Sequence, residues 1–83
     1  MKIVEIAGRR YRLFRVASIH EDADYVECRS MDSGECVCEI RVDAPDELYL
    51  LPMSIEADAN VVLEAIAYAK EMAQLSSGTA NSS

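Results

Sequence analysis

Apolar and polar residues alternate along most of the first fifty positions, which is the period of half-buried β-strands. The apolar positions are rich in β-branched and aromatic residues, and turn-forming residues separate them, with Gly8 in the first connection and Pro45 in the last. The pattern predicts four strands and allows a short fifth one. The expected strands are residues 2–6, 11–19, 25–31 and 36–42, and the fifth candidate is 48–51.

The apolar period becomes helical after Pro52. Residues 55–75 are rich in alanine and contain no glycine or proline, and Ser54 and Asp58 are both able to cap the start of a helix. At 100° per residue the apolar side chains gather on one half of this helix, although Leu63 falls outside it. The apolar half consists of Val61, Val62, Ala65, Ile66, Tyr68, Ala69, Met72 and Ala73.

Strands first and one helix last predict a single α+β domain over residues 1–75. We expect a four- or five-stranded antiparallel sheet, a meander, with one C-terminal helix packed on one face. Residues 76–83 are small and polar, and they predict a disordered tail. The pattern does not decide which face of the sheet the helix covers.

The first predicted hairpin is apolar on both of its faces. Val4 and Leu13 belong to one face, whereas Ile3, Phe14 and Val16 belong to the other. One helix covers only one face of a sheet, so part of this apolar surface is left over, and such surface often marks an interface. The alternative is that residues 48–51, or the loop beside the helix, fold over it.

The three cysteines lie around the third connection. A three-residue hairpin loop ending at Gly34, in the left-handed conformation, pairs Cys28 with Cys38 and Ser30 with Cys36. In this register all three thiols share the apolar face. We therefore interpret them as small buried hydrophobic side chains.

Metal binding is not expected from this cysteine pattern. The spacing matches no common zinc-ligand pattern, and the only histidine, His20, lies in a different connection. We expect no metal and no cofactor. A disulfide between Cys28 and Cys38 on oxidation remains the alternative.

Charge is unevenly distributed along the chain, whose net charge is −7. Residues 1–15 hold five basic residues and one acid, whereas residues 16–83 hold three basic residues and fourteen acids. The acidic part would repel nucleic acid and anionic lipid, so we expect neither as a direct partner. The arginines at 9, 10, 12 and 15 lie on both faces of their strand and form no single stripe for phosphates.

The cellular compartment is inferred from the absence of two sequence signals. No apolar run approaches the ~18 residues of a membrane span, and the first residues lack the pattern of a signal peptide. We therefore expect a cytoplasmic protein.

Catalysis is not expected either. No nucleotide-binding, nucleophile-elbow or zinc-protease motif occurs, and the one imidazole, His20, stands beside Glu21 and Asp22 in what we interpret as a polar loop. No nucleophile is tied to this cluster by a motif. We expect no catalytic residues.

These observations favour a small acidic, non-enzymatic protein-interaction module. In size and charge it is comparable to antitoxins and to phage-encoded inhibitors such as anti-CRISPRs. A basic site that normally holds nucleic acid is the expected target, because carboxylates in rows can stand in for phosphates. Its partner would be a protein with a basic surface. The alternative is a homodimeric structural or chaperone-like subunit that uses an exposed apolar sheet face. The candidate partner-binding residues are Asp22, Asp24, Glu27, Asp32, Glu35 and Glu39.

Overall fold

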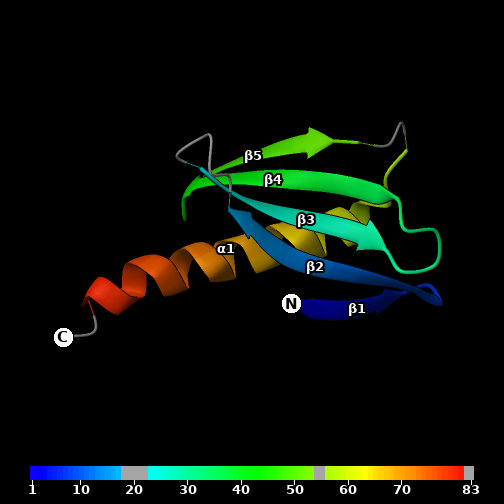
Figure 1. The fold of residues 1–83 in the computed structure, drawn as a ribbon, viewed down its shortest axis with the longest axis horizontal. Helices are drawn as coiled ribbons and strands as arrows, with labels where there is room; N and C mark the ends of the chain where they lie inside the picture. Colours follow the sequence, from blue (N-terminus) through cyan, green and yellow to red (C-terminus); the bar gives the residue numbers. More distant parts are fainter. Residues whose placement is uncertain (18–22, 54–55, 82–83) are drawn as a thin grey trace.

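The computed structural model describes residues 1–17, 23–53 and 56–81, with side chains up to residue 75. The described residues form one five-stranded antiparallel sheet in which each strand pairs with the next along the chain, in the order β1-β2-β3-β4-β5. One helix, α1, lies behind this sheet in Figure 1. The predicted α+β meander with a C-terminal helix is therefore confirmed. The elements are β1 Lys2–Ile6, β2 Arg9–Ala17, β3 Asp24–Ser30, β4 Cys36–Ala44, β5 Glu47–Pro52 and α1 Ala59–Asn81.

Residues 47–52 form the fifth strand rather than a cover for the first hairpin. Strand β5 pairs with β4 and extends the sheet on the side away from β1. Helix α1 covers the face that carries Val4 and Leu13. The opposite face, which we call the open face, therefore keeps Ile3, Phe14 and Val16 outside the core.

The β1–β2 and β3–β4 hairpins follow from turn chemistry. Ile6 pairs with Arg9, so the first turn is Ala7-Gly8, and both residues have positive φ, 52° and 78°. Such two-residue turns match the right-handed twist of the flanking strands. Gly34, with φ 77°, takes the left-handed position expected in the third connection.

The core lies between the middle of the sheet and one side of α1. Leu13, Val26 and Ile40 from the sheet are at most 1% exposed, and Val61 and Ala65 of the helix are fully buried against them. Every helix residue predicted to face the sheet is buried or half-buried, and Leu63 is 62% exposed as its position off the apolar stripe predicts.

The limits of α1 differ from the expected ones. The helix begins at Ala59, where the Asp58 carboxylate accepts a hydrogen bond from the Asn60 N–H at 2.8 Å, so Asp58 is the cap. Ser54 lies outside the described residues. The helical backbone continues through residues 76–81, which we had expected in a disordered tail, because each added residue of an existing helix gains one backbone bond. No helix of the described residues is both long and apolar enough to cross a membrane.

A bulge in the β3–β4 pair changes the predicted positions of the cysteines. Cys28 does lie opposite Cys38, but the register then shifts, and Cys36 pairs with Arg29 instead of Ser30. Val37 is the extra residue of β4 and packs against the core. Cys36 therefore turns to the open face, and the prediction that all three thiols share one face is wrong.

Candidate protein-interaction surface

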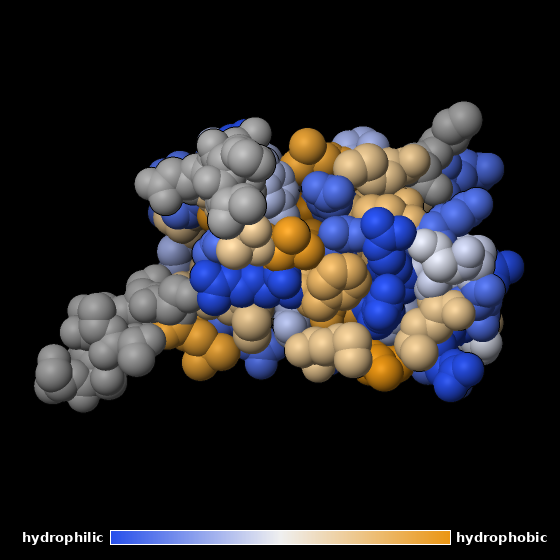
Figure 2. Space-filling model, viewed as in Figure 1, coloured by the Kyte–Doolittle hydropathy of each residue, from blue (hydrophilic) through white to orange (hydrophobic). Residues whose placement is uncertain are grey.

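Helix α1 leaves the open face of the sheet uncovered. In the view of Figure 2, which looks onto this face, apolar and strongly hydrophilic residues are interleaved. Because residues paired across antiparallel strands point to the same side, the register groups the side chains of this face into rows that run across the strands.

The central row runs from Phe14 through Glu27 and Glu39 to Leu51, with one residue from each of four neighbouring strands. It places two carboxylates directly opposite each other between two apolar side chains. The Glu27 side chain is only 14% exposed. Like charges that face each other across strands destabilise a sheet, so this row carries an electrostatic cost.

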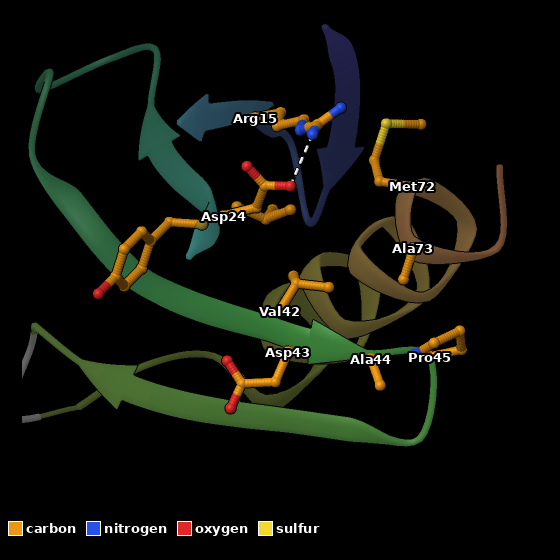
Figure 3. A pocket seen from close by; sticks show the side chains of 10 residues that line it. Arg15, Asp24, Val42, Asp43, Ala44, Pro45, Met72 and Ala73 are labelled. Atoms are coloured by element: carbon orange, nitrogen blue, oxygen red, sulfur yellow. Dashed lines mark hydrogen bonds and ion pairs between the residues drawn. The ribbon is translucent and has the colours of Figure 1, made fainter. Parts of the chain in front are cut away.

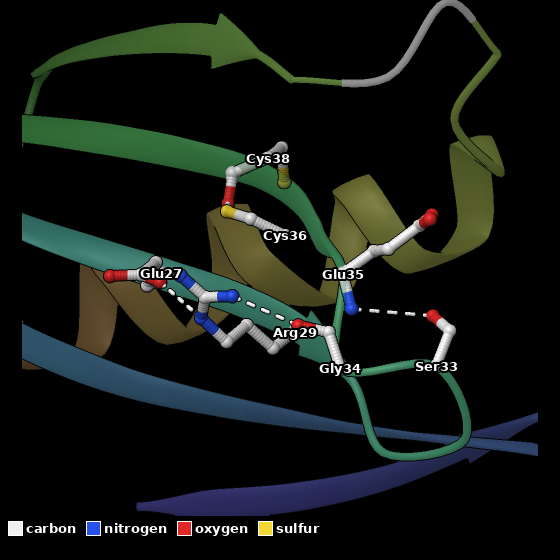
Figure 4. A network of polar contacts seen from close by, with 7 residues as sticks. All are labelled: Glu27, Arg29, Ser33, Gly34, Glu35, Cys36 and Cys38. Atoms are coloured by element: carbon white, nitrogen blue, oxygen red, sulfur yellow. Dashed lines mark hydrogen bonds and ion pairs between the residues drawn. The ribbon is translucent and has the colours of Figure 1, made fainter.

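In the part of the chain that the structure describes, one of the two central carboxylates is paired with a cation and the other is not. Arg29 donates a hydrogen bond from Nε to Glu27 Oε1 at 2.5 Å, and its Nη1 donates to the Gly34 carbonyl at 2.9 Å (Figure 4). Within the described part of the chain, the Glu39 side chain makes no hydrogen bond or ion pair. Glu39 is therefore the half-buried carboxylate of this face that lacks a countercharge.

Two arginines of the open face lie against aromatic rings. The Arg41 guanidinium lies 4.4 Å from the ring centre of Tyr49, and that of Arg12 lies 5.2 Å from the ring centre of Phe14. Arg41 also pairs with Asp43, at 3.2 Å between Nε and Oδ1. These contacts fix the positions of both guanidinium groups on the surface. Arg41 is engaged by Tyr49 and Asp43 and forms no ion pair with Glu39.

The other predicted partner-binding acids lie elsewhere. Asp24 is on the helix-covered side, where its carboxylate pairs with Arg15 at 2.6 Å at the edge of a pocket of about 230 Å³ (Figure 3). Asp32 and Glu35 are exposed in the loop between β3 and β4. Asp22 lies outside the described residues. The structure thus brings together Glu27 and Glu39 and separates them from the rest.

The pocket beside Asp24 offers little for catalysis. Its apolar wall comes from Val42, Met72 and Ala73, and Arg15 and Asp24 neutralise each other at its mouth. The volume is below the roughly 300–1,000 Å³ typical of ligand sites. Within the described residues, no three potential ligands among histidine, cysteine, aspartate and glutamate converge on a metal site.

The thiols have two different environments. Cys28 and Cys38 are fully buried, and the neighbouring Cys38 thiol together with burial raises the pKa of Cys28. Cys36 is half-buried on the open face, where its S–H donates to the Cys38 carbonyl at 3.6 Å. Burial, followed by the charges of Glu27 and Glu39, raises the pKa of Cys36. All three cysteines are free thiols.

Alkylation of the folded protein with iodoacetamide is expected to modify Cys36 first, and Cys28 and Cys38 only after unfolding. Because the pKa of Cys36 is raised, its thiolate forms at higher pH, so its labelling rate should rise at higher pH than that of a cysteine in a short peptide. Peptide mass spectrometry measures both. Cys36→Ser should abolish labelling of the folded chain, and native-state labelling of Cys28 would contradict the assigned burial.

Several residues of this surface escaped the sequence analysis. Tyr49 and Leu51 were read only as a candidate strand, and Phe14 only as leftover apolar surface. Extending the predicted register of β3 and β4 to residues 48–51 would have placed Tyr49 beside Arg41, which was the available signal.

No family model, curated protein or solved structure matches the chain.

Proposed function

We propose that the protein is a small acidic, non-enzymatic interaction module that receives a cationic side chain of a partner protein between Glu27 and Glu39. The observation that carries this proposal is the Glu39 carboxylate, which has no partner among the described residues and lies opposite Glu27 at the centre of the open face. A partner cation between the two would relieve their repulsion. Relief of this repulsion would make the free energy of complex formation more favourable.

The surroundings of the two carboxylates favour arginine as that cation. A guanidinium is planar and donates paired hydrogen bonds to carboxylates, and it also stacks on aromatic rings. Phe14 lies in the same row, and Tyr25 and Tyr49 lie in the next. Aromatic residues and arginines are enriched at the centres of protein interfaces, where they contribute most of the binding energy.

The overall charge supports a basic partner. The fourteen acids of residues 16–83 would attract a positively charged surface over a distance and speed the encounter. A partner that uses its basic site to hold nucleic acid would be neutralised when this module occupies that site, as an antitoxin or an anti-CRISPR neutralises its target. Asp32 and Glu35, exposed at one end of the sheet, add to the attraction without lying in the central row.

Reversal of the unpaired charge tests the proposal. Glu39→Arg is expected to abolish capture of the partner from a lysate of the native host, whereas wild type retains it. Glu71→Arg is the matched control, because Glu71 is exposed on the side of α1 away from the sheet. With the purified partner, Glu39→Arg should cost roughly 2–5 kcal/mol of binding energy, as expected for a desolvated charge pair. Equal retention of one partner by both variants would refute this site.

A further inference from the structure

The outer edge of β5 is apolar and uncharged after the acid Glu47 at its start, whereas the other edge of the sheet carries charges within its strand. Residues 48–53 carry no charge, and β5 has no strand on its outer side among the described residues. Strand β1 at the opposite edge carries Lys2 and Glu5, and charged edges of this kind discourage strand pairing. Large apolar residues are exposed along the β5 edge: Tyr49 47%, Leu50 47%, Leu51 37% and Met53 51%.

The backbone of β5 has hydrogen-bonding groups directed outwards. The Met53 N–H donates to the Val37 carbonyl at 3.3 Å, in the same register that pairs Leu50 with Ile40. Because bonded and non-bonded positions alternate in an antiparallel pair, Tyr49 and Leu51 bond to β4. The N–H and C=O groups of Leu48 and Leu50 therefore point away from the sheet.

A groove next to β5 extends the apolar edge. Leu48 and Leu50 of β5, Ile66 of α1 and Ile40 form its apolar part, around a volume of about 630 Å³. Asp46, Lys70 and Gln74 also line the groove. Helix α1 packs mainly on β4 and β3 and contacts β5 less, through the side of the strand that carries Leu48. Leu50 is consequently half exposed, although its cross-strand neighbour Ile40 is 1% exposed.

We propose that β5 pairs antiparallel with β5 of a second copy of this chain, around a two-fold axis at Tyr49. In this register Leu48 lies opposite Leu50 of the second copy, and the two symmetric pairs form four backbone hydrogen bonds. All outward groups of Leu48 and Leu50 are then bonded. Pro52 has no N–H, so it limits the ladder to this short stretch.

A second copy fits this edge because the stretch 48–50, Leu-Tyr-Leu, reads the same in both directions. Antiparallel pairing with itself sets leucine against leucine on the groove side and tyrosine against tyrosine on the open-face side. A two-fold axis requires such self-complementarity. Residues 48–53 carry no charge that needs a countercharge, and the one charge of β5, Glu47, lies at its start, so a basic strand would gain nothing specific from residues 48–53.

The proposed dimer has a distinctive salt dependence. Each copy carries a net charge of −7, so two copies repel each other, and added salt screens that repulsion. The dimer should therefore tighten with increasing salt concentration. A basic partner strand on the same edge would bind more weakly as salt rises, so the sign of the salt effect separates the two occupants.

Sedimentation of the full chain at increasing concentration tests the dimer. Wild type should reach twice the mass of one chain, and Leu50→Lys should raise the dimer dissociation constant at least tenfold. Ile3→Lys is the matched control, since Ile3 is 51% exposed on the opposite edge strand and receives the same charge. Circular dichroism confirms that each variant is folded. Glu39→Arg should leave the dimer intact, so this inference and the proposed function fail separately.

Disulfide trapping tests the register. On a Cys36→Ser background, Tyr49→Cys should cross-link two copies readily, because non-bonded antiparallel pairs bring Cα atoms to about 4.5 Å, within disulfide range. Leu51→Cys lies on the same side of the strand but would be about 14 Å from its twin, which is four residues further along at about 3.4 Å per residue on the neighbouring strand, and it should not cross-link. This arm does not depend on how Leu50→Lys folds.

Three results would overturn the proposal. The first is a wild type that stays monomeric at every concentration and salt level, with Tyr49→Cys no faster to cross-link than Leu51→Cys. The second is a dimer that Ile3→Lys disrupts and Leu50→Lys does not, which would place the interface elsewhere. The third is a dimer that weakens as salt is added.

Discussion

Replacing Leu13 with alanine is expected to lower the free energy of unfolding by about 2–5 kcal/mol. Leu13 is fully buried in β2, where it lies opposite Cys28 in the sheet and belongs to the core that packs against α1. The substitution removes buried apolar surface and leaves a cavity that rigid strands on both sides cannot fill. The total free energy of unfolding of a small domain is only about 5–15 kcal/mol, so this substitution would remove a large fraction of it.

Urea denaturation followed by circular dichroism measures this loss. Leu63→Ala makes the same chemical change on α1 at a residue that is 62% exposed, and it should alter the unfolding free energy by less than about 0.5 kcal/mol. Similar midpoints for the two variants would mean that Leu13 is not at the centre of the core.

The second large effect is expected from Ala69→Leu in α1. Ala65 and Ala69 are both fully buried, and they let the helix backbone approach the sheet closely, where Cys28 and Cys38 are also small. A leucine at 69 has no space and must push the helix away from the strands. Overpacking of this kind costs about 1–3 kcal/mol, and more where the packed elements cannot shift.

Ala67→Leu is the matched control, because Ala67 is exposed on the same helix and leucine forms helices nearly as well as alanine. Thermal unfolding should show a lower midpoint for Ala69→Leu alone. If both variants unfold at the wild-type temperature, then the helix does not pack on the sheet through its alanines.

Residue periodicity was sufficient to predict the elements and their order. The period-2 alternation of β2 and β3 and the 100° stripe of α1 arise because each element is buried on one side. One-sided burial sets the spacing of apolar residues, and that spacing is visible in the sequence. The pattern allowed β5 without requiring it, because four residues before a proline fit either a strand or a cover for the first hairpin. The face covered by α1 could not be predicted, since both faces of β1 and β2 carry apolar residues.

The bulge explains the main error in register. Strand β4 reads as a regular strand, and Val37 is apolar in either register, so no residue type marks the extra position. Only tertiary packing decides that Val37 turns to the core and Cys36 to the open face. The assumption of a three-residue loop between β3 and β4 therefore predicted the correct cross-strand partners for Val26 and Cys28 but the wrong partner for Cys36.

The candidate site was predictable only in part. Glu27 and Glu39 were among the six acids proposed, and their pairing follows from the part of the register that was correct. Asp24 turned out to neutralise Arg15, because the end of β2 brings the two together, and sequence separation gives no hint of that contact. The aromatic partners of the arginines depend on β5, which the sequence left open.

The strictly sequential order of the strands has a consequence for how the chain folds. Every strand pairs with its neighbour in sequence across a short connection, so closing each hairpin costs little chain entropy and the pairings need no distant segment. Sheet formation can therefore proceed hairpin by hairpin, from β1 towards β5, as the polypeptide leaves the ribosome. The apolar side of the sheet stays exposed to water until α1, which follows the strands in the chain, has been synthesised, so the helix completes the core.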